Sequence, residues 1–284
     1  MKPVVFTVLF LSIAVGFSAA ADEDGSFDRT LSVSGKVQLD LKTDSGGITV
    51  VPGSSGAVRI HAILKAEHGW MGAGDVMQRI HELEQNPPIE ANGNRIRVGY
   101  VHDPNLLRNI SMRLEIQTPP DTQVQAHADS GGIRVSGLSG PVDCKTDSGG
   151  IEVHDVNADV HVAADSGGIR IENVNGPVFA RVDSGGIVAR DVAGYVDAQA
   201  DSGGVHIVQT KAAPIRAKTD SGGVTVALAP GAGYDVRVDS DSGNISLPAT
   251  AENAGFSRHH REGKVHGGGP LVDVQVSSGN VSIE

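Results

Sequence analysis

The chain has 284 residues, of which 34 are acidic and 23 are basic, giving a formal net charge of −11 at pH 7. This acidic balance disfavours nucleic acid and anionic lipid surfaces as partners. One cysteine cannot form an intramolecular disulfide, and aromatic residues make up only 4% of the chain, so the composition favours thin, regular β structure over a thick globular core.

The first segment, residues 1–21, is predicted to be a secretory signal peptide. Lys2 supplies a positive start, residues 4–17 are almost wholly apolar, and residues 18–21 are the small residues typical of a cleavage site. We therefore expect an exported protein of the periplasm, cell envelope or extracellular space. No later stretch is apolar for long enough to span a bilayer, so no membrane insertion is expected after signal cleavage.

The next segment, residues 22–128, is expected to form an N-terminal β region with a helical insertion at about 66–94. In that insertion Val76, Ile80 and Leu83 have the spacing of one apolar stripe on a short helix. We expect the insertion to cap or flank the first coils, because an open end would pair edge to edge with other chains. Strands are predicted around it at 27–33, 37–43, 48–51, 58–64, 96–101 and 110–116.

A repeated pentapeptide dominates residues 129–284. The phrase DSGGI or DSGGV begins at residues 129, 147, 165, 183 and 201, in successive steps of 18 residues, with further copies at 44 and 220. The positions four and six after each Asp are apolar, as are those five and three before it, and the positions between them are mostly polar. This alternation predicts two strands with one buried face each, so every repeat is strand, turn, strand, turn.

The identity of residues in equivalent columns favours a parallel solenoid over an antiparallel meander. In a solenoid each coil stacks on the last at about 4.8 Å, so that Ile lies on Ile and Gly on Gly. We predict an all-β protein: a parallel, right-handed β-helix (β-solenoid) with 18-residue coils and one short helix in an insertion. A loop insertion at 249–270 is expected to leave the regular coils before the closing strand.

The corner phrase itself is predicted to be structural. Each Asp is expected to accept backbone N–H bonds in its own turn. The alternative is a calcium-binding ladder of carboxylates about 5 Å apart at Asp129, Asp147, Asp165, Asp183 and Asp201. Because the Asp precedes the glycines, whereas it follows them in the calcium-binding β-roll, we favour the turn and predict no cofactor. The glycines expected to permit the bend with positive φ are Gly131, Gly132, Gly149, Gly150, Gly167, Gly168, Gly185, Gly186, Gly203 and Gly204.

No catalytic residue is predicted. The repeated serines, such as Ser148, lack the G-x-S-x-G surroundings of a hydrolase nucleophile. His266 precedes three glycines, as in some esterases, and with His259 and His260 it suggests a transition-metal site; a flexible polar loop is the interpretation we favour. Cys144 shares a column with alanines and valines and is expected to be buried and unreactive.

Several segments resemble the "putative adhesin" family of exported bacterial β-strand-repeat proteins, whose function is unknown. The resemblance rests on FDRTLSV at residues 27–33, the S-G-G-I/V phrase, LEIQTP at 114–119 and GGGP at 267–270 before the terminal S-G-N-V strand. It covers nearly the whole mature chain. It implies a role in envelope or surface interaction and brings no catalytic residues to this sequence.

We therefore predict a non-enzymatic, exported β-solenoid that presents a ladder-like surface to an envelope or surface partner, either a protein or a glycan. The alternatives are a glycan-active β-helix enzyme and a Ca²⁺-stabilised structural solenoid. An enzyme would need paired carboxylates in a cleft beside one of the insertions. The aromatic residues considered as platforms for sugar are scattered along the sequence, at Trp70, Tyr100, Tyr195 and Tyr234.

Overall fold

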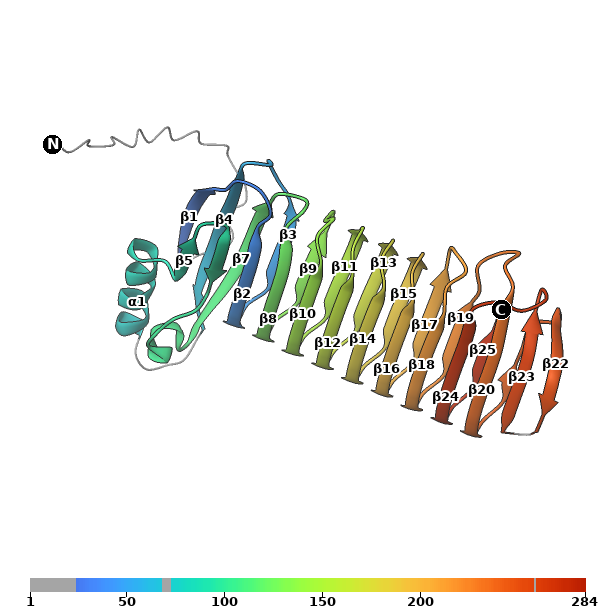
Figure 1. Cartoon of the computed structure of the whole chain (residues 1–284). Helices are drawn as coiled ribbons and strands as arrows, with labels where there is room; N and C mark the ends of the chain where they lie inside the picture. The colour runs from blue at the N-terminus through green and yellow to red at the C-terminus, as the bar shows by residue number, and fades with distance from the viewer. Residues whose placement is uncertain (1–23, 68–72, 258) are drawn as a thin grey trace.

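The computed structural model describes residues 24–67, 73–257 and 259–284, so the signal peptide predicted at 1–21 lies outside the described residues. These residues form two long sheets that lie against each other along the whole molecule (Figure 1). Sheet A has twelve strands and sheet B has thirteen. The fold is mostly β, and its two long, largely parallel sheets are those of a β-solenoid.

The strands follow one another across each sheet in an order that differs from chain order at both ends. In sheet A the order is β1 (Gly25–Ser32), β4 (Ala57–Ala66), β7 (Ile110–Thr118), β3 (Ile48–Pro52), β9 (Ile133–Ser136), β11 (Ile151–Val156), β13 (Ile169–Val174), β15 (Ile187–Val192), β17 (Val205–Gln209), β19 (Val224–Ala227), β25 (Val281–Ile283) and β21 (Ile245–Ser246). In sheet B the order is β22 (Ala251–Phe256), β23 (His260–Val265), β20 (Tyr234–Ser242), β24 (Leu271–Ser278), β18 (Ile215–Ser221), β16 (Val196–Ser202), β14 (Val178–Ser184), β12 (Val160–Ser166), β10 (Val142–Ser148), β8 (Gln123–Ser130), β2 (Gln38–Ser45), β6 (Arg95–Val98) and β5 (Ile89–Asn92).

From β8 to β19 the chain alternates regularly between the sheets. A strand of sheet B, the Asp-Ser-Gly-Gly corner after it and the following strand of sheet A form what we call a coil. Each strand pairs in parallel with its equivalent in the next coil, so that Val142 lies opposite Val160 and Ile151 opposite Ile169. Identical residues therefore stack in columns, as the repeat predicts.

The core is a narrow apolar layer between the two sheets. The inward positions of both strands, represented by Val142, Cys144, Ile151 and Val153, are at most 1% exposed. Burial also raises the pKa of the Cys144 thiol, because the charged thiolate is disfavoured in an apolar layer. The prediction that Cys144 is a small buried residue is confirmed.

The N-terminal end of the molecule carries the one α-helix of the described residues, α1 (Ala73–Gln85), which packs against β1 and β4 (Figure 1). Its apolar stripe is buried as predicted, with Val76, Ile80 and Leu83 at most 7% exposed. A short 3₁₀ turn, η1 (Pro104–Leu107), precedes β7. No helix in the described ranges combines the length and apolar character needed to cross a membrane.

The first and last coils in chain order lie inside the stack. At the N-terminal end β2 lies between β6 and β8, and β3 lies between β7 and β9. At the C-terminal end β24 lies between β20 and β18, and β25 lies between β21 and β19. Each of these coils therefore has a neighbour on both sides.

The segment 249–270, expected to be a loop, contains the antiparallel pair β22 and β23, which extends sheet B beyond β20. The buried positions of β23 are Gly263 and Val265, and its other described positions are charged or polar. A strand that buries so few apolar side chains leaves little alternation in the sequence, which is why this pair is difficult to predict.

Candidate functional site

The first glycine of each corner is required by the backbone. Gly149 has a φ of 152°, and a Cβ added there would lie 2.2 Å from the carbonyl oxygen of Gly131 in the neighbouring coil. The second glycine differs, since Gly150 has no positive φ and its added Cβ would lie 3.3 Å from the carbonyl oxygen of Gly168. The expectation of positive φ thus holds at Gly131, Gly149, Gly167, Gly185 and Gly203 and is wrong at Gly132, Gly150, Gly168, Gly186 and Gly204.

The corners are tied to one another through the backbone. The N–H of Gly131 donates to the carbonyl oxygen of Ser148, and the N–H of Ile133 donates to that of Gly150. Where the residue before the Asp is a threonine it adds a bond, as when the buried Thr146 hydroxyl donates to the Gly131 carbonyl oxygen at 3.1 Å. Carbonyl oxygens of the next coil, rather than the Asp side chains, thus satisfy these N–H groups.

The corner carboxylates form ion pairs instead of the expected bonds to the turn backbone. Five of them pair with a basic residue two positions earlier on the outward face of sheet B, whereas Asp165 and Asp201 have Ala163 and Gln199 at that position. The pairs are Asp44 with Lys42 at 3.5 Å, Asp129 with His127 at 2.8 Å, Asp147 with Lys145 at 3.7 Å, Asp183 with Arg181 at 3.7 Å and Asp220 with Lys218 at 3.9 Å.

The described residues offer one cluster with the composition of a metal site. It consists of His127, Asp129 and Asp147, whose ligand atoms lie within 4.8 Å of one another. Calcium prefers six to eight oxygen ligands, whereas this cluster supplies an imidazole nitrogen and places the ammonium of Lys145 beside Asp147. The donor set therefore does not fit a calcium ladder.

The second turn of the coil also has a structural column. Asp155, Asn173 and Asp191 all have φ near 54–55°, a left-handed conformation that Asn and Asp tolerate better than most residues. The Asn173 amide donates to the Asp155 carboxylate of the neighbouring coil at 2.5 Å. The apolar residue that follows each of these positions, such as Val174, is fully buried, as predicted.

The three histidines near the C-terminus have separate partners. His260 pairs with Asp239 at 2.6 Å, His259 contacts the carbonyl oxygen of Ser240 at 3.0 Å, and His266 contacts that of Ala232 at 3.1 Å. The suggested metal site is not assembled among these residues. The corner serines, for their part, stack in register at the ends of the sheet B strands, with Ser148 opposite Ser166.

A row of rings lies on the outward face of sheet B. The His161 and Phe179 rings stack at 4.5 Å with an interplanar angle of 14°, and the Tyr195 ring meets Phe179 edge-on at 5.6 Å. His161 and Phe179 are 18 residues apart in the sequence, and the parallel register places them directly opposite each other. Because the rings cover each other's faces, the row supports the stack more than it offers a platform for sugar. Tyr234, in contrast, is fully buried, and Trp70 lies outside the described residues.

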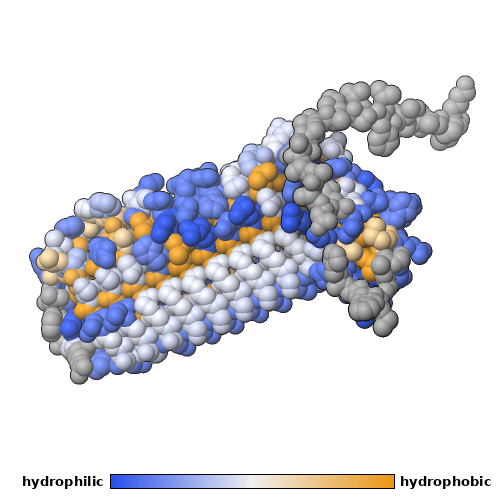
Figure 2. Space-filling model, turned by 180° about the vertical axis from the view of Figure 1, so that it is seen from behind, coloured by the Kyte–Doolittle hydropathy of each residue, from blue (hydrophilic) through white to orange (hydrophobic). Residues whose placement is uncertain are grey.

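The outward face of sheet A carries alternating charges. Arg134 donates to Glu152 of the next coil, and Arg170 pairs with Glu172 at 3.1 Å. The hydrogen bond from Arg134 lowers the pKa of Glu152. Figure 2 shows a pale band of intermediate hydropathy along the molecule, with hydrophilic and hydrophobic areas beside it.

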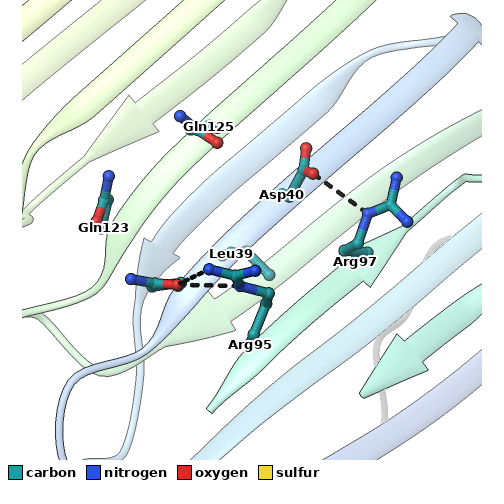
Figure 3. A pocket seen from close by; sticks show the side chains of 7 residues that line it. Leu39, Asp40, Arg95, Arg97, Gln123 and Gln125 are labelled. Carbon is teal, nitrogen blue, oxygen red and sulfur yellow. Dashed lines mark hydrogen bonds and ion pairs between the residues drawn. The ribbon is translucent and has the colours of Figure 1, made fainter. Parts of the chain in front are cut away.

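A polar concavity lies near the N-terminal end of sheet B, and we call it the polar hollow. It has a volume of about 470 Å³. Figure 3 shows its polar side chains on the outward face of neighbouring strands, with the buried Leu39 behind them. They come from β2, β6 and β8, and the lining residues are Gln38, Leu39, Asp40, Arg95, Arg97, Gln123 and Gln125.

One wall of the polar hollow is held rigidly by a charged cluster. Arg97 pairs with Asp40 at 3.4 Å and with Glu90 at 2.8 Å, and its guanidinium lies 3.9 Å from the centre of the Tyr100 ring. The Tyr100 hydroxyl donates to Asp40 at 2.5 Å. Burial, together with the bond to Asp40, raises the pKa of Tyr100 to about 12, so this hydroxyl stays protonated and keeps its bond at neutral pH.

Sequence reasoning missed the polar hollow because its residues are far apart in the chain. They meet only because β2 lies between β6 and β8, an order that the repeat does not specify. The available signal was the alternation in each strand, which marks residues such as Arg95 and Gln123 as outward-facing.

The fold and these sites define a repeat protein built from stacked β-coils. Residues 90–284 match the model of the family described as Toastrack DUF4097, and the chain belongs to this family. The family resemblance inferred from the sequence is therefore confirmed. Comparison with curated proteins gives no match.

Two solved structures are similar over most of the chain. One is a "putative cell adhesion protein" from Clostridium sporogenes, with 13% identity and a TM-score of 0.29, covering 91% of this chain and 98% of that one. The other is a "putative adhesin" from Bacteroides fragilis, with 10% identity and a TM-score of 0.30, covering 93% of this chain and 99% of that one.

Proposed function

We propose that this protein is a non-enzymatic, exported β-solenoid, wound to the right in 18-residue coils, that presents the outward face of sheet B to an envelope or surface partner, a protein or a glycan. The main support for the proposal is that the inward and corner columns stay constant along the stack, whereas an outward column varies. Corner and inward positions repeat from coil to coil, whereas one outward column changes from Gln125 to Asp143, His161, Phe179 and Asp197. A regular scaffold with a position-specific surface suits recognition.

The proposal of a non-enzymatic role is supported by how the acidic groups are used. A glycoside hydrolase needs two carboxyl groups facing the substrate, one acting as an acid. At the 66–94 insertion the two carboxylates Asp40 and Glu90 both contact Arg97, which holds them as ion-pair partners. We expect no turnover of any polysaccharide in a panel incubated with the purified protein, and release of reducing ends above that of a protein-free control would contradict this.

The test of recognition is retention of purified residues 22–284 on envelope fractions. The variant D143A/Q199A alters the outward face of sheet B without touching the stacked rings, and R134A/R170A alters the outward face of sheet A as a matched control. We expect the sheet B variant to lose retention by about tenfold, as for removal of a few interface contacts, and the control to be retained like the unaltered protein. No retention of the unaltered protein, or equal loss in both variants, would overturn the proposal.

A further inference from the structure

The polar hollow contains an arginine whose charge is not balanced by a carboxylate. The Arg95 side chain is exposed, and its Nε and Nη2 donate to the neutral amide oxygen of Gln38 at 3.1 and 3.0 Å. In the part of the chain that the structure describes, no ion pair is formed by Arg95, whereas Arg97 beside it is paired twice. A cationic group thus faces solvent on a protein with a net charge of −11.

The remaining side chains of the hollow form two short rows across three strands. One row is Arg95, Gln38 and Gln123, and the other is Arg97, Asp40 and Gln125. Gln123 and Gln125 are exposed on the same face of β8 (Figure 3). Each amide presents two donors and an acceptor, which match the donor and acceptor character of a sugar hydroxyl.

We propose that the polar hollow binds an acidic saccharide, with the sugar carboxylate on Arg95 and the neighbouring hydroxyls on Gln123 and Gln125. The guanidinium of Arg95 keeps donors beyond the two that Gln38 engages, and a guanidinium is the preferred partner of a carboxylate because of its planar geometry. This inference rests on the proposed function and names the class of ligand recognised by sheet B.

A peptide is a poorer fit for the same site. Peptide recognition relies on apolar or aromatic anchors in pockets, or on pairing with the edge of a sheet. The hollow lies on the face of sheet B, and its one apolar lining residue, Leu39, is 1% exposed. A ligand rich in hydroxyls makes better use of this lining than an apolar anchor would.

Arg95, and not Arg97, is the residue to substitute in a test of this site. Asp40, Glu90 and the Tyr100 ring hold Arg97, so its replacement would also disturb the wall. Arg95→Gln removes the charge and keeps an amide near Gln38. Arg190, which is exposed on sheet A, offers the same change of charge outside the hollow as Arg190→Gln.

The experiment is isothermal titration calorimetry with tri-galacturonic acid and 3′-sialyllactose, each compared with its methyl ester. We expect the unaltered protein to bind at least one acid with a Kd near or below about 1 mM and its ester at least about tenfold more weakly. Arg95→Gln should weaken acid binding by about tenfold, Gln123→Ala/Gln125→Ala should weaken it severalfold, and Arg190→Gln should leave it unchanged. Equal thermal unfolding of the variants confirms that they are folded.

Binding of neither acid by the unaltered protein, equal binding of acid and ester, or an unchanged Kd in Arg95→Gln would overturn the inference. Its failure is distinguishable from failure of the proposed function. If retention on envelope fractions depends on the sheet B face but not on Arg95, only the proposal of an acidic saccharide is wrong, and the proposed function stands. If the unaltered protein shows neither retention on envelope fractions nor saccharide binding, both the proposed function and the acidic-saccharide site are wrong.

Discussion

At Gly149 the neighbouring coil leaves no room for a side chain. The carbonyl oxygen of Gly131 lies only 2.2 Å from the position that a Cβ would take, and the same close contact recurs between Gly167 and Gly149. Because parallel strands of neighbouring coils are separated by about 4.8 Å, any corner that packs backbone on backbone meets this limit. The first glycine of the repeat is therefore kept by the stacking itself and needs no ligand to explain it.

Gly149→Val is therefore expected to be far more harmful than Arg170→Val. The valine has a strained φ and a contact with backbone that cannot move without opening the stack, so the free energy of unfolding should fall by at least about 3 kcal/mol. Arg170 is exposed, and its replacement should cost less than about 1 kcal/mol. Urea unfolding followed by circular dichroism measures both, and equal stabilities would show that the assigned register is wrong.

A pH dependence is expected at His260. Its hydrogen bond to Asp239, together with the nearby Glu262, raises the pKa of His260 above its ordinary value, and the neighbouring cations are Arg261 and Arg237. A raised folded-state pKa means that the stabilising effect is complete below the unfolded pKa of about 6.5 and is lost as pH rises through the folded pKa.

The measurement is an NMR titration of the His260 ring, assigned by comparison with His260→Gln. The midpoint should lie above about 6.5, and the stability difference between the two proteins should shrink as the pH rises above that value. A midpoint at or below the value of a free histidine would contradict the pairing between β20 and β23 at this position.

At the scale of the element, the corner charges of sheet B are arranged in pairs along five of its strands, β2, β8, β10, β14 and β18. A basic residue precedes the Asp by two positions at Lys145 and Asp147, and again at Arg181 and Asp183. The two side chains lie on one face of the same strand, because side chains alternate with a period of two. These pairs lessen the repulsion within a column of carboxylates without any added cation.

We therefore expect the stability of the protein to be independent of calcium. Excess EDTA and millimolar Ca²⁺ should give melting temperatures that agree within about 1 °C, since a ligand that does not bind the folded state cannot stabilise it. Differential scanning fluorimetry makes the comparison, with Lys145→Gln/Arg181→Gln as a variant in which unpaired carboxylates are exposed. A rise of several degrees in the melting temperature of the unaltered protein with Ca²⁺ would instead support the hypothesis of a calcium-binding ladder.

The sequence predicts the regular elements well because each depends on a local spacing of apolar residues, which is two in the strands and three or four in the helix. Ile151 and Val153 mark a strand by themselves, and the stripe of Val76, Ile80 and Leu83 marks α1. The candidate binding surface is less predictable. Arg95 and Gln123 become neighbours of Gln38 through pairing across distant strands, and nothing in their local sequence specifies that pairing.

At the scale of the whole molecule, the first and last coils in chain order lie inside the stack and not at its ends. This arrangement is possible because the repeated coils have similar inward faces. Coils with the same inward columns can each pair with any other, so the columns do not fix the order of stacking. Beyond β20 the chain forms the pair β22 and β23 before it returns as β24 between β20 and β18. The closing coil thereby gains a neighbour on each side, and neither terminal coil presents its strands as the open edge of the stack.

The order of the C-terminal coils can be tested by cysteine pairs in a Cys144→Ala background. Ser221 and Ser278 lie opposite each other in β18 and β24, so S221C/S278C should form a disulfide readily. Ser242 lies opposite Ser278 on the other side of β24, which places it two strand spacings, about 10 Å, from Ser221. S221C/S242C should therefore stay reduced, because disulfides need Cα atoms within about 7 Å.

Mass spectrometry under mild oxidation separates the two cases. Efficient crosslinking of S221C/S242C would show that the coils stack in chain order, with the closing coil at the outer end where its strands would form an unprotected edge.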